Sequence, residues 1–287
     1  MADAFSWNPA VDWQELTRYA FMREALAAGT IAAVVCGLVG YFVVLRGLTF
    51  ATDALTHVGF AGASGAVLVG ISPIAGLLAF TTVTALGMGA LDERMRGRDV
   101  VTGMILVEAL GLGILFLRLS SGSSNEAYAL LFGDILALTT GNLVVLAAAG
   151  AAALAATAAV FRPLLFASLD DEVAASRGVP VRALATAFLL ILAVAVVTAA
   201  QTVGALLAVA LVVGPAASAH RLTTRPIAGV AVSVGLALAV SWLGLCLAFW
   251  LPYPASFFVT SLCAVQYAAV HVATSLPGRR AFVRAPA

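Results

Sequence analysis

An acid and an imidazole lie four residues apart in a mostly apolar stretch of this chain. Asp53 and His57 belong to the segment LRGLTFATDALTHVGFAG. Positions i and i+4 fall on one face of a helix, so both side chains can reach the same partner. A carboxylate oxygen and a neutral imidazole nitrogen are ligands that a divalent transition metal accepts. The pair therefore predicts a metal-binding position.

Three further side chains are candidates for the same path. With a rise of about 1.5 Å per residue, His57 lies about 15 Å from the inner end of its segment, and Glu108 lies about 12 Å from the inner end of its own. Glu108 is therefore expected to share the depth of the pair. Asp134, in LLFGDILALTTGN, and His271, in the last apolar run, are weaker candidates.

Structural roles remain open for each of these residues. Asp53 and His57 can bond each other, and burial can hold Glu108 protonated. Asp134 can cap a helix after an outer loop. His271 can have a structural or interfacial role at the inner surface.

The elements that carry these residues are expected to lie in a membrane. Hydrophobic residues make up 62% of the 287 positions and charged residues 10%, and the mean hydropathy is +1.07. A water-soluble domain carries about 25% charged residues. The sequence therefore predicts an all-α, polytopic membrane protein and indicates no nucleic-acid partner.

Runs of about 20 apolar residues, the length that crosses a bilayer, recur along the chain. The run 183–219 is long enough for two short crossings, with a break at Gln201 and Gly204 and a disturbance at Pro215. This predicts nine transmembrane helices, or eight if part of that run enters and returns. The expected membrane domain is 20–276, between an interfacial segment at 1–19 and a cytoplasmic tail at 277–287.

Arginine placement predicts the orientation. With the N-terminus outside and nine crossings, twelve of the fifteen arginines fall in inner loops, and only Arg18, Arg23 and Arg118 fall outside. The positive-inside rule favours this arrangement, which puts the C-terminus in the cytoplasm.

A short cytoplasmic helix is predicted in the loop SLDDEVAASRGVPVR. Ser168 followed three residues later by Asp171 suggests a capping box, and acids suit a helix start. Gly178 followed by Pro180 is typical of a helix end. The expected helix is about Leu169–Arg177, within a loop region of 168–178.

The order of these motifs resembles the permease subunits of the zinc/manganese/iron family of bacterial ABC importers. The similar segments are LRGLTFATDALTHVGFAG, AYALLFGDILAL, SLDDEVAASRGVPV and VGALLAVALVVGPAASAHRL. The resemblance implies a homodimer in the bacterial cytoplasmic membrane, a separate cytosolic ATPase and an extracytoplasmic metal-binding protein. It also implies that Asp53 and His57 are path ligands. The implied ATPase-coupling helix contains Leu169, Asp170, Asp171, Glu172, Val173, Ala174, Arg177 and Gly178.

The metal is less sharply defined than the family. Zn²⁺ and Mn²⁺ are both candidate cargoes, with iron a further one, and no permanently bound cofactor is expected. Thr52 stands where many relatives have Gly, and Glu108 has no His nearby. More oxygen and less imidazole favours manganese or iron over zinc.

Other function classes predict different observations. An ion-coupled secondary transporter would use Asp53 and Glu108 as proton carriers. A permease for a larger chelate, such as a cobalamin or siderophore, would have a wide, aromatic-lined path. The chain has neither HExxH nor G-x-x-x-x-G-K-[ST], so the expectation is a non-enzymatic permease whose ATP is hydrolysed on a partner.

Overall fold

The described part of the chain is a bundle of helices. The computed structural model describes residues 18–91, 98–120, 133, 135, 138–205 and 207–275. The helices in chain order are α2 (Ala20–Leu45), α3 (Thr49–Val69), α4 (Pro73–Leu91), α5 (Arg98–Leu119), α7 (Thr140–Leu169), α8 (Asp171–Ser176), α9 (Val181–Val203), α10 (Ala208–Leu222), α11 (Pro226–Trp250) and α12 (Ala255–Ser275).

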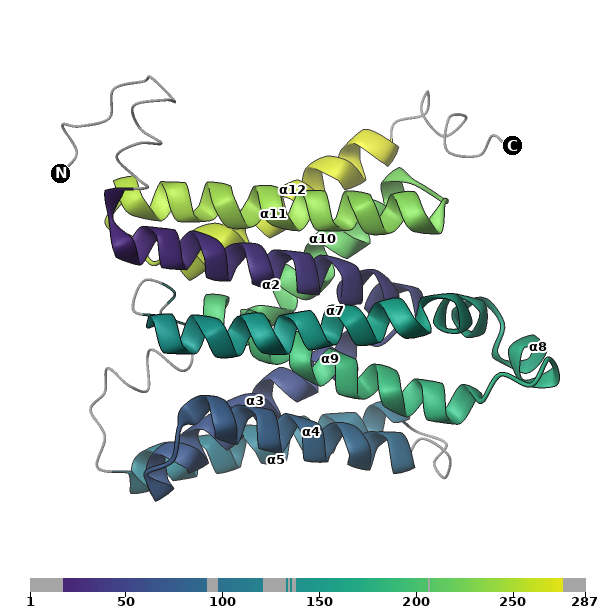
Figure 1. Cartoon of the computed structure of the whole chain (residues 1–287), viewed down its shortest axis with the longest axis horizontal. Helices are drawn as coiled ribbons and strands as arrows, with labels where there is room; N and C mark the ends of the chain where they lie inside the picture. The colour runs from purple at the N-terminus through teal and green to yellow at the C-terminus, as the bar shows by residue number, and fades with distance from the viewer. Residues whose placement is uncertain are drawn as a thin grey trace.

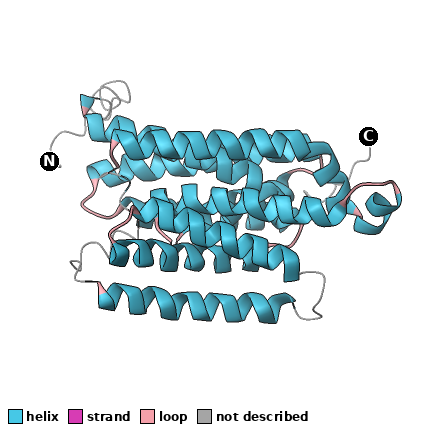
Figure 2. Cartoon of the chain, turned by 60° about the horizontal axis from the view of Figure 1, so that its bottom comes forward, coloured by secondary structure: helices cyan, strands magenta, loops and turns pink. Residues whose placement is uncertain are grey.

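Most of these helices run along the long axis of the bundle, and α8 projects from one end of it (Figure 1). The end that carries α8, called here the α8 end, also holds the end of α12, whereas α2 begins at the opposite end. The view in Figure 2 shows the same elongated helical bundle from another side. The described chain thus begins and ends at opposite ends of the bundle.

The centre of the bundle is built from α2 and α9. In each of them, 67% of the most apolar window is buried, against 17% in α5 and 11% in α12. The main hydrophobic core includes Phe42 on α2 together with Phe188 and Leu192 on α9, all fully buried. The outer helices therefore present most of their apolar side chains to their surroundings, as a lipid environment requires.

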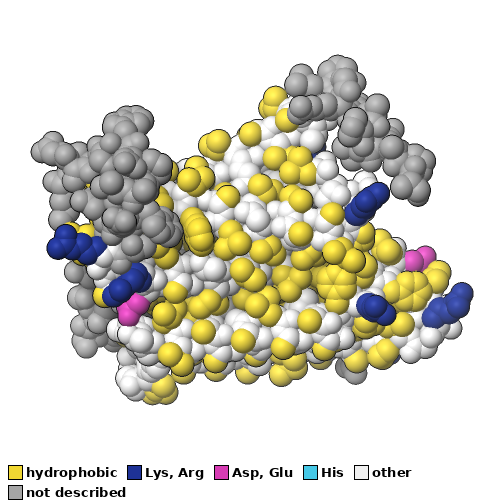
Figure 3. Space-filling view, turned by 45° about the horizontal axis from the view of Figure 1, so that its top comes forward, with side chains coloured by type: hydrophobic (Ala, Val, Ile, Leu, Met, Phe, Trp, Pro, Cys, Tyr) yellow, Lys and Arg dark blue, Asp and Glu magenta, His cyan; other side chains and the backbone are white. Residues whose placement is uncertain are grey.

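Seven helices among the described residues are long and apolar enough to cross a membrane: α2, α4, α5, α7, α9, α11 and α12. The apolar helix α10 has only 15 residues. The 21-residue α3 is outside this set, and its Thr, Asp, His and Ser side chains lower its hydropathy. The face in Figure 3 has hydrophobic side chains across its middle and arginines near its ends. A multi-pass arrangement follows, while the count of nine or eight crossings stays a prediction.

The predicted break in the long apolar run is confirmed. Helix α9 ends at Val203, and Gly204 has φ +89°, a conformation that favours glycine. Helix α10 begins at Ala208 and ends at Leu222. Pro215 does not end the second helix, because α10 continues through this buried proline.

Helix α3 is held close to its neighbour α4 by a pair of glycines. A Cβ atom at Gly76 would collide with the backbone oxygen of Gly62, and a Cβ atom at Gly62 would collide with that of Gly76. A similar contact lies between α2 and α10, where a Cβ atom at Gly40 would collide with the carbonyl of Val212. Small residues let helix backbones approach in a membrane, where packing contacts rather than water drive association.

The close contact between Gly62 on α3 and Gly76 on α4 predicts that one added methyl group lowers stability strongly. Gly76→Ala should destabilise the protein in detergent by about 1–3 kcal/mol, because the α3 and α4 backbones must move apart. Gly87→Ala is the matched control in α4, since a Cβ atom there meets nothing within 4 Å. It should be neutral or stabilise by up to about 1 kcal/mol. Thermal unfolding of both variants measures the difference, and equal midpoints would contradict the close crossing.

Candidate metal path and coupling helix

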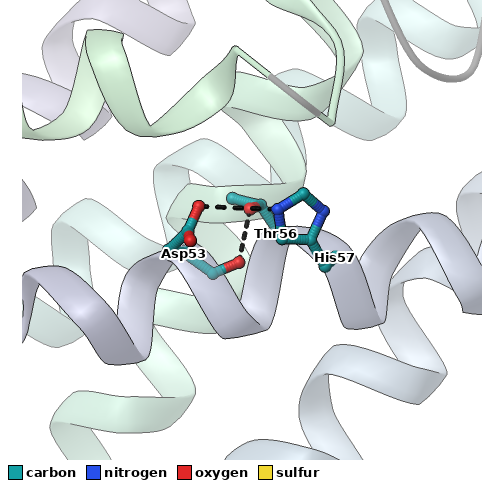
Figure 4. Close-up of polar contacts among 3 residues, drawn as sticks. All are labelled: Asp53, Thr56 and His57. Carbon is teal, nitrogen blue, oxygen red and sulfur yellow. Dashed lines mark hydrogen bonds and ion pairs between the residues drawn. The ribbon is translucent and has the colours of Figure 1, made fainter. Parts of the chain in front are cut away.

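Asp53 and His57 project from the same side of α3 (Figure 4). His57 Nε2 lies 3.6 Å from Asp53 Oδ1, which is within ion-pair range but longer than a good hydrogen bond. The side chain of Asp53 is 39% exposed and that of His57 is 11% exposed. The carboxylate is therefore the accessible member of the pair, and the imidazole is the buried one.

The hydrogen bonds of the pair are incomplete. His57 Nδ1 is buried and has no hydrogen-bond partner among the described residues. The nearby Thr56 hydroxyl donates to the backbone oxygen of Asp53 at 2.6 Å, so this bond does not engage the carboxylate. Buried polar atoms usually have a partner, and exceptions call for an explanation. Asp53 and His57 contact each other, as the structural interpretation expects, but this contact leaves His57 Nδ1 without a partner among the described residues.

Contacts with its neighbours set the position of α3. A turn at Arg46–Leu48 links it directly to α2, with Gly47 at φ +67°. Apolar contacts hold α3 against α5, where Val58 and Ala61 cluster with Ala109. The Gly62–Gly76 contact holds α3 against α4. Together, these contacts fix α3 along its side and at its first residue.

Within one chain, Glu108 does not form a cluster with Asp53 and His57. It is exposed on α5, next to the face on which Ile105, Ala109 and Leu112 pack toward α3. Among the described residues, no group of three or more His, Cys, Asp or Glu side chains could hold a metal ion. A role for Glu108 in the path stays a prediction that a single copy of the chain does not test.

The weaker candidates are also separate from the pair. His271 is exposed on α12, with its ring centroid 6.1 Å from that of Tyr267. Asp134 lies outside the described residues. Sequence reasoning did not single out Gln266, whose buried Nε2 has no partner among the described residues. The signal that could have identified it is a polar amide side chain within an apolar run.

The remaining histidine of the chain has a structural role. His220 Nε2 donates to the backbone oxygen of Tyr41 at 2.9 Å, since that oxygen can only accept. Its ring also stacks on the Tyr41 ring, with centroids 4.2 Å apart and planes at 12°. These contacts join the end of α10 to α2.

The short helix exists, but its expected start at Leu169 was wrong. Leu169 ends α7, which continues through Pro163, and Asp170 is the N-cap of α8. Asp170 accepts a hydrogen bond from Val173 N at 3.0 Å. The predicted capping box was also wrong, because the Ser168 hydroxyl donates to Leu164 O inside α7.

The end of α8 agrees with the prediction. Arg177 follows its last residue, and Gly178 has φ +83°. Ala174 is fully buried and anchors α8. In contrast, Leu169 and Val173 are 68% and 45% exposed, and the acids at 170–172 are exposed as well. The helix therefore shows a mixed apolar and acidic surface beyond the end of the bundle.

Residues 18–274 match the family described as ABC 3 transport family. The chain belongs to this family. It is 31% identical over 214 residues to the manganese transport system membrane protein MntC of Halalkalibacterium halodurans, covering 74% of this chain and 73% of that one. It is 30% identical over 235 residues to the manganese import system permease protein ScaB of Streptococcus parasanguinis, covering 80% and 82%.

A solved structure has the same fold. PsaBC from Streptococcus pneumoniae in complex with Fab matches with a TM-score of 0.83 and 26% identity, covering 94% of this chain and 97% of that chain. The resemblance to metal-importer permeases is thereby confirmed. As a member of the ABC 3 transport family, the chain is a multi-pass membrane permease of metal importers.

The pair offers this ABC 3 permease a partial coordination sphere. One carboxylate supplies oxygen and one neutral imidazole supplies nitrogen, which suits manganese, iron or zinc. Two ligands are fewer than the four or more that these ions take in proteins. Among the described residues of one chain, the pair is therefore not a complete metal site.

The N-cap of α8 yields a local prediction. Asp170→Ala should destabilise α8 by about 1 kcal/mol, because the Val173 amide loses its acceptor. Hydrogen exchange at the α8 amides should become about fivefold faster. Asp170→Asn keeps an acceptor and should exchange like the unaltered protein. If the alanine variant also exchanged normally, the cap would have no part in forming α8.

Proposed function

We propose that this chain is the membrane subunit of an ATP-driven importer whose cargo is a divalent transition metal, with manganese preferred over zinc and iron. The observation that carries the proposal is the Asp53–His57 pair, with a half-exposed carboxylate and an unbonded imidazole nitrogen on a buried helix. Relatives named as manganese transport proteins support the metal.

The coordination would be completed by a second copy. Two copies facing each other would offer two carboxylates and two imidazoles, enough to replace much of the hydration shell of the ion. Adding Glu108 would raise the share of oxygen ligands and favour manganese. Its exposed position on an apolar helix supports this role, because an acid facing lipid near the middle of a span costs about 2.5–3.5 kcal/mol.

Energy would come from a separate ATPase that docks on α8. The chain has no phosphate-binding loop, so ATP would be hydrolysed on that partner. The exposed Val173 and Leu169, beside the acids of α8, would form the docking surface at the cytoplasmic side. A binding protein would deliver the ion at the opposite end, where the N-terminus would lie outside the cell.

Loss of either ligand should abolish transport. In vesicles containing the permease and its ATPase, Asp53→Ala and His57→Ala should each reduce ATP-dependent Mn²⁺ uptake by more than about 100-fold. Even an outer partner of a metal ligand contributes 10–100-fold. Glu24→Ala controls for loss of a carboxylate, since Glu24 accepts from Thr140 Oγ1 on the neighbouring α7. Normal uptake by both path variants would remove the site.

The same vesicles separate the competing functions. Uptake driven by a proton gradient without the ATPase would identify a secondary transporter. Uptake of a siderophore or cobalamin that survives both path substitutions would identify a chelate permease. Competition among Mn²⁺, Zn²⁺ and Fe²⁺ measures the preference, and Glu108→Gln should lower Mn²⁺ uptake more than Zn²⁺ uptake.

The docking surface predicts a binding defect with intact folding. Val173→Asp should weaken ATPase binding by at least about tenfold, because it places a charge in an apolar contact. Ile227→Asp is the matched control, since Ile227 is 76% exposed at the start of α11 on the same end of the bundle. Pull-down of the ATPase measures the difference. Equal recovery with both variants would show that α8 is not the docking element.

A further inference from the structure

A hydrogen bond links the start of the metal-path helix to the base of α8. Arg46 Nη1 donates to Ser168 Oγ at 3.4 Å, joining residues 122 positions apart. Arg46 lies in the three-residue turn between α2 and α3, and Ser168 lies in the last turn of α7, two residues before the N-cap of α8. The contact therefore connects the turn that leads into α3 with the end of α7 that leads into α8.

The chemistry of Ser168 makes it an acceptor for the arginine. Its hydroxyl hydrogen is donated to Leu164 O at 2.6 Å, which leaves the oxygen lone pairs free to accept. The bond to Leu164 O fixes the orientation of the Ser168 hydroxyl, whose oxygen accepts the hydrogen bond from Arg46. The Arg46–Ser168 bond is therefore attached to the last turn of α7 and does not depend on a freely rotating hydroxyl.

The position of the turn determines what the bond can move. Helix α8 is anchored through Ala174 and follows α7 without a linker, apart from Asp170. Helix α3 begins three residues after Arg46, and Asp53 lies in its second turn. A shift of the α7 end would therefore have only a short path to the carboxylate, through this bond and the first turn of α3.

We infer that Arg46 and Ser168 are positioning residues that couple movement of α8 to the Asp53–His57 pair. This inference rests on the proposed function, in which an ATPase moves α8. Neither residue contacts the cargo in this role. They make the start of α3 move with the end of α7. ATP hydrolysis thereby changes which side of the membrane the Asp53 carboxylate is exposed to.

The expected signature is ATP hydrolysis without matching transport. In vesicles with the ATPase, Ser168→Ala should lower Mn²⁺ transported per ATP by about fivefold or more, the usual size of coupling between sites. The KM for Mn²⁺ should change little, because Asp53 and His57 remain. Ser168→Thr keeps the hydroxyl and should restore most of the ratio, which a purely packing role would not predict.

A control serine separates this role from helix stability. Ser275 donates to His271 O at 2.7 Å in the last turn of α12, the same bond that Ser168 makes in α7. Ser275→Ala should leave the ratio of Mn²⁺ to ATP unchanged. Arg46→Gln should lower the ratio as Ser168→Ala does, and the double variant should be no worse than either single one.

The outcomes separate this inference from the function it rests on. If the unaltered complex shows no ATP-dependent Mn²⁺ uptake, the proposed function fails and this inference fails with it. If the unaltered complex transports Mn²⁺ and the Ser168 and Arg46 variants keep its ratio of Mn²⁺ to ATP, the inference alone is overturned. Independent, additive losses in the double variant would also overturn it, since two residues of one contact must act together.

Discussion

The constraint on which this structure depends is the cost of holding a carboxylate within an apolar bundle. Asp53 lies in the second turn of α3, where its side chain is 39% exposed, and its ion-pair contact among the described residues is the 3.6 Å approach to His57. The cost of an acid in a membrane helix rises toward the centre of the span, so this position keeps the cost down. His57 in turn leaves Nδ1 without a partner among the described residues. A passing dication would engage both groups at once. The incomplete satisfaction of the pair is thus the physical basis of the proposed path.

The rest of the bundle keeps this pair in place. Close backbone contact at Gly62 and Gly76 holds α3 against α4, and apolar contacts hold it against α5. The buried helices α2 and α9 form the centre, and α10 is bonded to α2 through His220 and Tyr41. A closely packed interior transmits displacement instead of absorbing it. Motion at the α8 end can therefore reach a site more than one helical turn inside the bundle.

The proposed weak binding of the metal at Asp53 and His57 and the Arg46–Ser168 bond would serve the same transport cycle. On the proposed function, the two ligands of one chain would not trap an ion, and a second copy or Glu108 would decide when coordination is complete. The Arg46–Ser168 bond joins the helix that carries these ligands to the segment that would meet the ATPase. Affinity and access would then change together, as alternating access requires.

Local sequence patterns were sufficient for the features that depend on neighbouring residues. The i, i+4 spacing placed Asp53 and His57 on one face, and apolar runs indicated the helices, because both follow from helical periodicity and hydrophobicity. Gly204 marked the break between α9 and α10, since its positive φ suits glycine. The start of α8 is also set locally, by the Asp170 cap, although the sequence pattern placed it too early. The Arg46–Ser168 contact and the close approach of Gly62 to Gly76 were decided only by the tertiary structure. Both depend on which residues of different helices lie beside one another, and no local pattern contains that information.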